Sequence, residues 1–304
     1  MLKIKIKIGK QYMQQILDLK VNVRRRLEYI EFQIIWEGSI GRRKLFEQFS
    51  ISMQQATLDI NNYISICPEN IDYDLRKKTY VKSNNFKPAF IKGDASEYFS
   101  QLEALHSGYR NEQEIWTHSL PSFDSVSIHR KKVNAKSLAK VLEAIREKSA
   151  LKGKYLSLSS DGDEFRIMMP HSIANDGHRW HMRAYDYDKK RFSDFVLSRL
   201  HALKKIESPM VECPLDEDWE TQIKIVLIVD PTLDNRRKEQ IEYEYQMKNG
   251  RLEIKIRKAM LLYNLRYFGF DPFELEGGKM RNKSSFHLMV ENLNEVEEWI
   301  GRRK

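Results

Sequence analysis

The sequence predicts an α+β protein of three modules: a helical, basic N-terminal module, a central module of short strands, and a small C-terminal module of alternating strands and helices. Three observations support this prediction. A chain of 304 residues is long enough for two or three domains. Apolar residues recur with helical spacing up to about residue 65, whereas strand-like alternation begins near residue 155. The net charge is +7 over residues 1–95, +4 over residues 96–209 and −2 over residues 210–304.

The composition excludes several classes of protein. Hydrophobic residues at 41% and charged residues at 31% are typical of a soluble globular chain. Two cysteines, Cys67 and Cys213, are too few for a disulfide framework or a four-ligand zinc site. Apolar runs are far shorter than the roughly 20 residues that span a bilayer, and the opening MLKIKIKIGK lacks the apolar core of a secretory signal. We therefore expect a cytoplasmic protein with no membrane partner and no cofactor.

The N-terminal module predicts three helices. The first runs from Arg24 to Gly38, the second begins after Ser39, and Ser52 is a suitable N-cap for a third that ends near Ser65. Their apolar residues recur one, three and four positions apart, as on the buried face of a helix. These residues are Leu27, Ile30, Ile34, Ile35, Leu45, Phe46, Phe49, Ala56, Ile60, Tyr63 and Ile64.

A basic hairpin follows the helices. Short strands are expected at residues 71–73 and 79–81, joined by Leu75-Arg76-Lys77-Lys78. Three helices and a hairpin in this order are typical of a winged helix-turn-helix. We assign residues 1–95 to this domain, leaving the first 20 or so residues unassigned. Residues 96–120 are expected to form a helical connector.

The outward face of the third helix and the hairpin carry the expected DNA contacts. In such domains the last helix enters the major groove, where Gln and Asn amides pair with adenine, and basic residues contact phosphates. A polar helix face alone is also compatible with ordinary solvated surface, but the local charge of +7 favours double-stranded DNA. The expected contacts are Arg42, Arg43, Lys44, Ser52, Gln54, Gln55, Thr57, Asn61, Arg76, Lys77 and Lys78.

The central module, residues 121–209, predicts one helix and a small β-barrel. A helix at residues 137–148 precedes short strands separated by turn residues. The expected strands are 155–159, 165–169, 179–185 and 192–197. In the first of these strands, Leu156 and Leu158 are expected to point inward.

The strand at residues 179–185 has one apolar and one polar face. Trp180, Met182 and Ala184 alternate with polar residues, so they are expected to point into the core. The polar face carries Arg179, His181, Arg183 and Tyr185. Arginines on a sheet face suit an anion or nucleotide, but Asp186 and Asp194 could equally neutralise them in a salt-bridged surface. Spacing leaves both possibilities open.

The C-terminal module, residues 210–304, alternates between strands and helices. Strands are expected at 223–229 and 252–257, and helices after Pro231 and at 259–267. This pattern predicts a small layered α+β domain.

The central module resembles the WYL-domain family. Trp180-His181-Met182 lie at the position of its name-giving triplet, and Pro170-His171, Arg183-Ala184-Tyr185 and the residues from Asp194 to Arg199 agree with it. Over residues 20–304 the chain resembles bacterial WYL transcriptional regulators of phage-defence islands, of the BREX- and CBASS-associated type. Two departures are His181 and Met182, which stand where the family has Tyr and Leu.

This resemblance implies a homodimer that binds a palindromic operator and represses. It implies an Sm/SH3-like barrel in the WYL domain, which senses a nucleotide or nucleic-acid ligand, and a WCX-type C-terminal domain that dimerises. The sensor positions that it implies are Tyr155, Ser157, His171, Arg179, His181, Arg183 and Arg199. By the alternation above, His181 suits the polar face better than Trp180 does.

Three alternatives were weighed. A metal site at His171, His178 and His181 is disfavoured because a strand places the last two on opposite faces. An enzyme is disfavoured because Ser157, His171 and Asp194 lack any supporting catalytic motif. The remaining alternative is an accessory protein that senses single-stranded nucleic acid without operator specificity.

Overall fold

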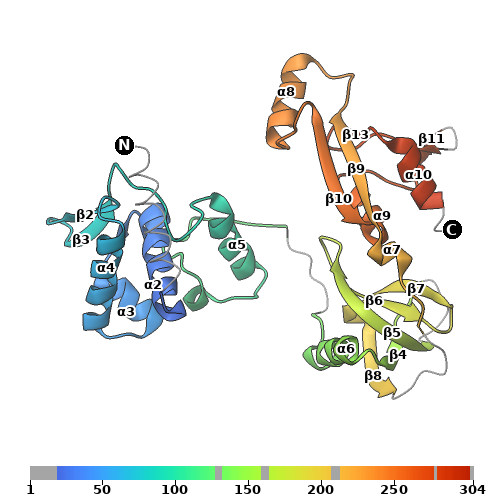
Figure 1. Ribbon diagram of the computed structural model, residues 1–304, viewed down its shortest axis with the longest axis horizontal. Helices are drawn as coiled ribbons and strands as arrows, with labels where there is room; N and C mark the ends of the chain where they lie inside the picture. The colour runs from blue at the N-terminus through green and yellow to red at the C-terminus, as the bar shows by residue number, and fades with distance from the viewer. Residues whose placement is uncertain (1–18, 127–131, 159–163, 207–212, 277–278, 302–304) are drawn as a thin grey trace, which may run out of the picture. The chain divides into compact units, whose positions relative to one another are not determined.

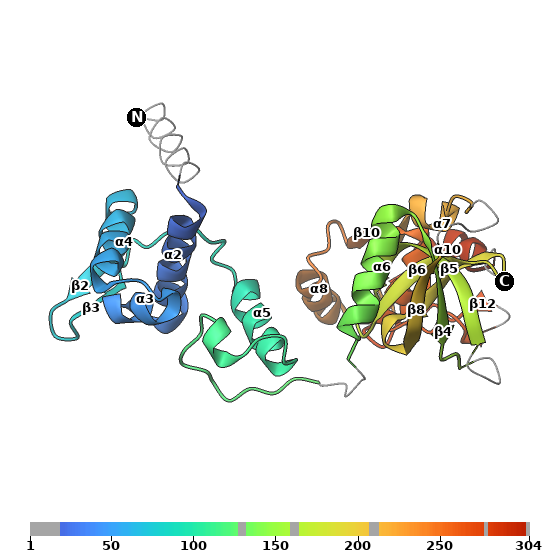
Figure 2. The same ribbon diagram turned by 90° about the horizontal axis from the view of Figure 1, so that it is seen from below.

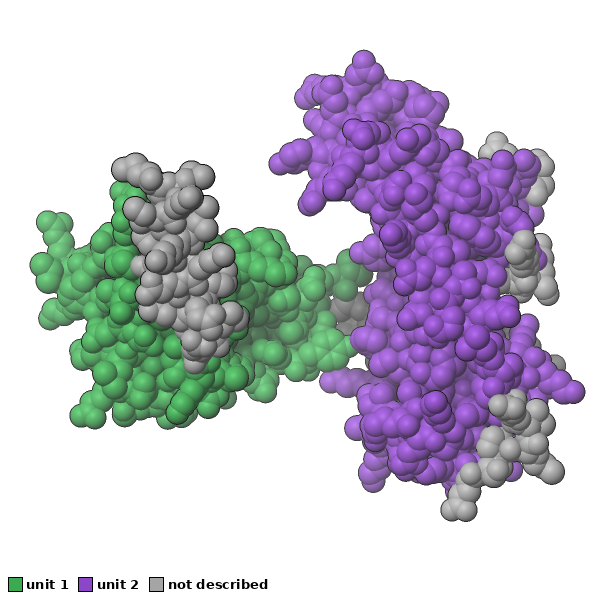
Figure 3. Space-filling view, viewed as in Figure 1, with its two compact units in different colours: residues 1–128 green, residues 129–304 purple. Residues whose placement is uncertain are grey.

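The computed structural model describes residues 19–126, 132–158, 164–206, 213–276 and 279–301. The chain divides into two compact units, residues 1–128 and 129–304 (Figure 3). Residues 1–18, which were left unassigned above, and residue 159 at the end of the strand expected at 155–159 lie outside the described residues.

The first unit contains a winged helix, as predicted (Figure 1). Three helices precede an antiparallel sheet of strand order β1-β3-β2, in which β2 and β3 form the wing. The sequence analysis missed the two-residue strand β1, which pairs with β3. The elements are α2 (Val21–Phe32) with a π-helical turn (Gln33–Glu37), β1 (Ser39–Ile40), α3 (Arg42–Phe49), α4 (Met53–Ile66), β2 (Ile71–Asp74) and β3 (Thr79–Lys82).

The helices pack through most of the expected apolar stripe. Leu27, Ile30 and Ile34 on the first helix and its π-helical turn are fully buried against Leu45 and Ile60. The prediction was wrong for Phe46, which is exposed. Helix α3 has only eight residues, and Leu45 is its one fully buried position. Phe46 is the next residue along the helix, so it points away from the buried face.

Residues 95–126 pack back onto the first helix. After α5 (Ala95–His106) and a 3₁₀ turn (Glu112–Glu114), Trp116 packs edge-on against Tyr29 and Phe32. The Gln33 side chain donates to the Trp116 carbonyl at 2.6 Å, and the Tyr29 hydroxyl lies 2.7 Å from His118 Nε2. The expected connector is therefore part of the packing of the first unit.

The central module is a five-stranded antiparallel sheet of order β7-β6-β5-β4-β8, with α6 on one face (Figure 2). The two edge strands do not pair with each other in the described part of the chain, so no closed barrel of the kind implied by the family resemblance is observed. The 3₁₀ turn Leu197–Arg199 connects one edge to the other. The elements are α6 (Ala135–Glu147), β4 (Ala150–Tyr155), β5 (Glu164–Asn175), β6 (Trp180–Asp186), β7 (Arg191–Val196) and β8 (Leu200–Ile206).

Two details of the predicted alternation were wrong. Strand β4 ends at Tyr155, so Leu158 lies beyond it and is 85% exposed. Met182 and Ala184 are fully buried as expected, but Trp180 is 46% exposed. Trp180 is the first residue of β6 and pairs with Asn175, the last residue of β5, so it lies at the open end of this hairpin, where the alternation of the strand does not enforce burial.

The C-terminal part alternates strands and helices as expected. Its sheet has the order β10-β9-β13, and Ile225, Leu227, Leu261 and Leu265 are buried in its core. The elements are α7 (Glu217–Glu220), β9 (Gln222–Val229), α8 (Asn235–Glu244), β10 (Arg251–Arg257), α9 (Leu261–Tyr267), β11 (Leu275–Glu276), β12 (Lys279–Met280), β13 (Leu288–Val290) and α10 (Leu293–Gly301). None of the helices in the described ranges is long and apolar enough to cross a membrane.

Candidate DNA-binding face and ligand cavity

Helix α4 has a firmly held inner face and an exposed outer face. The Ser52 hydroxyl accepts the Gln55 N–H at 3.1 Å and caps the helix. The buried Asp59 carboxylate accepts two hydrogen bonds from Arg26 on α2, at 2.6 and 3.0 Å. The outer face presents Gln54 and Asn61, which are exposed. The cap and the ion pair fix the direction in which this face points.

Several predicted DNA contacts already have partners in the protein. The Gln55 amide donates to Asp59 at 3.1 Å, and the Thr57 hydroxyl donates to the Met53 carbonyl at 2.9 Å. The Lys44 ammonium donates to the Gln33 side chain at 2.7 Å, and burial lowers the pKa of Lys44. These three residues are less available to DNA than Gln54 and Asn61.

The start of α3 offers two exposed cations. Arg42 is exposed, and Arg43 is exposed with its guanidinium 2.7 Å from Glu47. A surface ion pair of this kind contributes little to stability, so a phosphate can replace Glu47 without a large penalty.

The wing is a rigid hairpin with a basic tip. Asp74 Oδ1 accepts the N–H groups of Arg76 and Lys77 at 2.8 and 3.0 Å, which fixes the turn. The side chains of Arg76, Lys77 and Lys78 are all exposed. Leu75 beside them is also exposed. The turn at the tip of the hairpin thus presents three cations and one apolar side chain.

Two exposed apolar residues on this surface, Leu58 and Leu75, were not among the DNA contacts predicted from the sequence. Leu58 lies one turn after Gln54 on the outer face of α4, and it is largely exposed. The signal was available, because an apolar residue four positions from Gln54 must share its face. Leu58 can contact a thymine methyl group, as can Leu75 on the wing.

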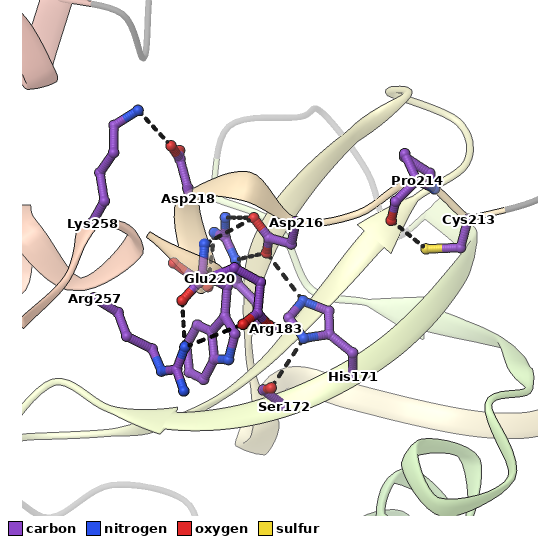
Figure 4. Close-up of polar contacts among 12 residues, drawn as sticks. His171, Ser172, Arg183, Cys213, Pro214, Asp216, Asp218, Glu220, Arg257 and Lys258 are labelled. Atoms are coloured by element: carbon purple, nitrogen blue, oxygen red, sulfur yellow. Dashed lines mark hydrogen bonds and ion pairs between the residues drawn. The ribbon is translucent and has the colours of Figure 1, made fainter. Parts of the chain in front are cut away.

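Five of the seven predicted sensor residues fall into two groups. The first is a buried ion-pair network that we call the Arg183 cluster: Arg183, His171, Asp194, Asp216 and Tyr263. Arg183, only 6% exposed, donates to Asp216 at 2.7 and 3.1 Å and to Asp194 at 3.2 Å. His171 Nε2 lies 3.0 Å from Asp216 Oδ2. The Asp216 carboxylate therefore lies between His171 and Arg183 (Figure 4). The Tyr263 hydroxyl donates to Asp194 at 3.1 Å.

The polar face of β6 is therefore covered. Asp216 precedes α7 and Tyr263 lies on α9, so both come from the C-terminal part. His181 is 2% exposed, its ring centroid lies 5.3 Å from that of Tyr263, and burial lowers its pKa. Arg179 pairs with Asp176 at 3.2 Å. Arg179, His181 and Arg183 therefore do not form an open anion-binding face, which was one of the two possibilities that the spacing left open.

Of the two expected neutralising carboxylates, only Asp194 reaches Arg183. Asp186 instead accepts from the buried Arg166 at 2.7 Å. The second partner of Arg183 is Asp216, 33 residues away in sequence. No local pattern singles out Asp216, so sequence reasoning missed it.

The second group lines a cavity of about 240 Å³. Three predicted sensor residues, Tyr155, Ser157 and Arg199, share this Tyr155 cavity with Lys189 and Phe195. The Tyr155 ring packs edge-on against Phe195 with centroids 5.0 Å apart. Two carboxylates, Asp186 and Asp194, also line the cavity. Its cations, hydroxyls and aromatic rings suit an anionic ligand that carries a ring, such as a nucleotide.

Asp194 belongs to both groups. It lines the Tyr155 cavity, and its carboxylate accepts from Arg183 and from Tyr263. A ligand in the cavity would therefore meet a side chain that is bonded to α9. Within the described residues, no group of three or more His, Cys, Asp or Glu side chains is placed to hold a metal ion.

Three family models match the chain in order. Residues 22–104 match the winged helix-turn-helix domain of the BrxR transcriptional regulator, residues 136–205 match the WYL domain, and residues 222–296 match the BrxR C-terminal dimerization domain. The matched segments coincide with the winged helix, the five-stranded sheet with α6, and the β9 sheet with its helices.

Two curated relatives are similar along nearly the whole chain. Both are DNA-binding transcriptional repressors named CapW. The protein from Stenotrophomonas maltophilia is 31% identical, with 91% of each chain covered, and that from Pseudomonas aeruginosa is 30% identical, also with 91% of each covered.

A solved structure, proteasome accessory factor B/C (PafBC) of Arthrobacter aurescens, is similar at 15% identity with a TM-score of 0.26. That alignment covers 92% of this chain and 48% of the other, so this chain spans about half of its length. The identity to the curated relatives and the three matched domains agree with each other. The chain belongs to the CapW family, with a WYL domain between BrxR-type winged-helix and C-terminal domains.

Proposed function

We propose that this protein is a dimeric, sequence-specific DNA-binding transcriptional repressor. The observation that carries the proposal is the winged helix, in which a capped and anchored α4 exposes Gln54 and Asn61 beside a wing with three cations. The CapW relatives are named DNA-binding transcriptional repressors, and the C-terminal residues match a dimerization domain. The protein acts as a regulator and not as an enzyme.

The partner in this proposal is a palindromic operator. Two winged helices related by a two-fold axis read two half-sites of opposite orientation, so the operator mirrors the dimer. In keeping with the resemblance to phage-defence regulators, the controlled genes are a phage-defence operon. A repressor that binds chromosomal DNA works in the bacterial cytoplasm.

Removing the charges of the wing tests the contacts to phosphate. We expect Arg76→Gln with Lys77→Gln and Lys78→Gln to weaken binding to every duplex, operator and scrambled alike. Log K falls as log salt rises, and each lost phosphate contact reduces the magnitude of this slope by about 0.9. The loss of three contacts therefore reduces it by about 2.7. Fluorescence anisotropy with both duplexes over a series of salt concentrations measures this change.

A matched control removes the same three charges elsewhere. Helix α8 carries Arg236, Arg237 and Lys238, and their replacement by Gln changes the net charge equally. Provided that light scattering shows an unchanged mass, this control keeps the wild-type slope. An unchanged slope in the wing variant would exclude the wing from the DNA interface.

We further propose that the Tyr155 cavity receives a nucleotide or nucleic-acid effector that weakens operator binding. What supports this is the set of cations and aromatic rings in the cavity and the position of Asp194 between it and α9. An effector that draws Asp194 away from Tyr263 would loosen the C-terminal part from the sheet. That part matches the dimerization domain, so the change would reach the spacing of the two winged helices.

Asp194→Asn tests this coupling. The variant keeps the shape of the side chain but removes its ion pair with Arg183 and weakens the hydrogen bond that it accepts from Tyr263. In the wild type we expect an effector from a panel of nucleotides and short single strands to lower operator affinity by roughly 5- to 150-fold. In Asp194→Asn the effector still binds, but this factor falls toward one. Operator titrations with and without effector measure both factors, and equal factors in the two proteins would contradict the coupling.

A further inference from the structure

A second cavity lies at the start of α6 and has a strongly basic wall. Its volume is about 280 Å³, and Lys132, Lys136, Lys140 and His201 line it together with Ser137 and Ser198. It shares no lining residue with the Tyr155 cavity: on the 3₁₀ turn between them, Ser198 faces this cavity and Arg199 the other. No carboxylate lines it among the described residues. We call it the lysine cavity.

The local backbone holds these cations in place. Asn134 accepts the Ser137 N–H at 3.1 Å and caps α6, whose first turns carry Lys136 and Lys140 on one face. The Lys140 ammonium donates to the Leu203 carbonyl at 2.6 Å, which anchors it to β8. Across the cavity, Ala202 has a φ of +51°, a left-handed conformation unfavourable for a residue with a Cβ. This bend lies directly beside His201.

His201 also lines the lysine cavity. Its Nε2 is buried but has no hydrogen-bond partner among the described residues. A buried polar atom without a partner is unfavourable, and in native proteins such an atom calls for a ligand or an ordered solvent molecule. An anion held by the ammonium groups would accept a hydrogen bond from this nitrogen if the His201 ring turned toward the cavity.

The lining defines the chemistry of that anion. Three ammonium groups, two hydroxyls and an imidazole are hydrogen-bond donors suited to phosphate oxygens. No Phe, Tyr or Trp lines the cavity, so a base would find no ring to stack on. We propose that the lysine cavity is a phosphate-binding site, which takes the phosphate group of a nucleotide or of a nucleic-acid strand. This site is additional to the Tyr155 cavity and to the winged helix.

Histidine NMR on the full-length protein tests the proposal without any DNA. The ring carbons are ¹³C-labelled, and His201→Gln identifies the signal of His201. Titration with inorganic pyrophosphate is expected to shift that signal with saturation. In Lys132→Gln with Lys136→Gln the affinity falls at least tenfold. Lys224→Gln with Lys255→Gln, an exposed cross-strand pair on β9 and β10, removes the same charge and keeps the wild-type affinity.

The outcomes separate this site from general charge screening. A shift that does not saturate, or equal affinities in the two lysine variants, overturns the proposal. Because no operator is present, this failure would say nothing against DNA binding by the winged helix.

Three further ligands identify the source of the phosphate. If AMP moves the His201 signal and adenosine does not, the site takes a terminal phosphate. If an unphosphorylated single strand or duplex moves it, and the lysine variant weakens that binding, the site takes a backbone phosphate. A His201 signal that responds to none of these ligands and not to pyrophosphate overturns the proposal.

Discussion

Alanine at both Gln54 and Asn61 is expected to reduce sharply the preference of the protein for its operator over unrelated duplex. Both side chains are exposed on the outer face of α4, and the structure shows no intramolecular role for either amide among the described residues. A bidentate contact to a base discriminates by about 1–3 kcal/mol, so two contacts supply about 2–6 kcal/mol. The lower end alone is roughly a 30-fold loss of discrimination. Competition between operator and scrambled duplex measures this ratio.

Gln55→Ala is the matched control for this variant. Gln55 is a neighbouring amide on the same helix, but its side chain already donates to Asp59. We therefore expect a much smaller loss of discrimination than in the double variant. If Gln54→Ala with Asn61→Ala kept the wild-type ratio while circular dichroism showed an intact fold, α4 would not be the reading helix.

Asp216→Ala is expected to have the largest effect on stability. It removes the partner of two hydrogen bonds from buried Arg183 and of one from His171. Breaking a buried ion pair from one side typically costs about 3–5 kcal/mol, and Arg183 then keeps its bond to Asp194 at 3.2 Å. We expect the free energy of unfolding of residues 129–304 to fall by about this amount. Denaturant titration followed by the fluorescence of Trp219 and its neighbours measures the difference.

Asp218→Ala separates this effect from a general loss of charge. Asp218 lies two residues further along, on α7, and pairs with Lys258 at 2.8 Å at a partly exposed position. A pair of this kind contributes about 0–1 kcal/mol. Equal destabilisation by the two substitutions would show that the Arg183 cluster has no special role in holding the C-terminal part to the sheet.

The same carboxylate makes stability depend on pH. Burial works to raise the pKa of Asp216, but hydrogen bonds from His171 and Arg183 outweigh it and hold this pKa well below its usual range. The ionised form thus stabilises the folded state fully above the unfolded pKa of about 3.9, and this contribution is lost as the pH falls below it. We expect the stability gap between wild type and Asp216→Asn to be constant from pH 7 to about 5. It should narrow below pH 4, and a gap that stays constant to pH 2 would contradict this assignment.

The winged helix was predictable because its signals are local. The apolar stripe of α2, the cap at Ser52 and the basic turn at Arg76 each depend on residues a few positions apart. What the sequence could not show is which polar side chains turn inward. Lys44 resembles any cation at the start of a helix, yet it reaches back to Gln33 across the turn of the chain.

The sensor residues were harder to predict because their environment is non-local. Strand alternation correctly separated Met182 from Arg183, but it cannot show what covers the polar face. That cover comes from Asp216 and Tyr263, far along the chain, and it converts an expected open face into a buried ion-pair network. Of the seven positions implied by family resemblance, Tyr155, Ser157 and Arg199 line a cavity because they lie where β4 ends and the chain turns between the two sheet edges.

The central claim is that this protein recognises one duplex sequence. A titration of the purified protein against the duplex upstream of its own gene, a scrambled duplex and the separated strands tests it most directly, at a stated salt concentration. The structure predicts that the upstream duplex binds at least about 10³-fold more tightly than the scrambled one. Equal binding to both duplexes, or a preference for single strands, would contradict the claim and favour an accessory protein that senses single-stranded nucleic acid.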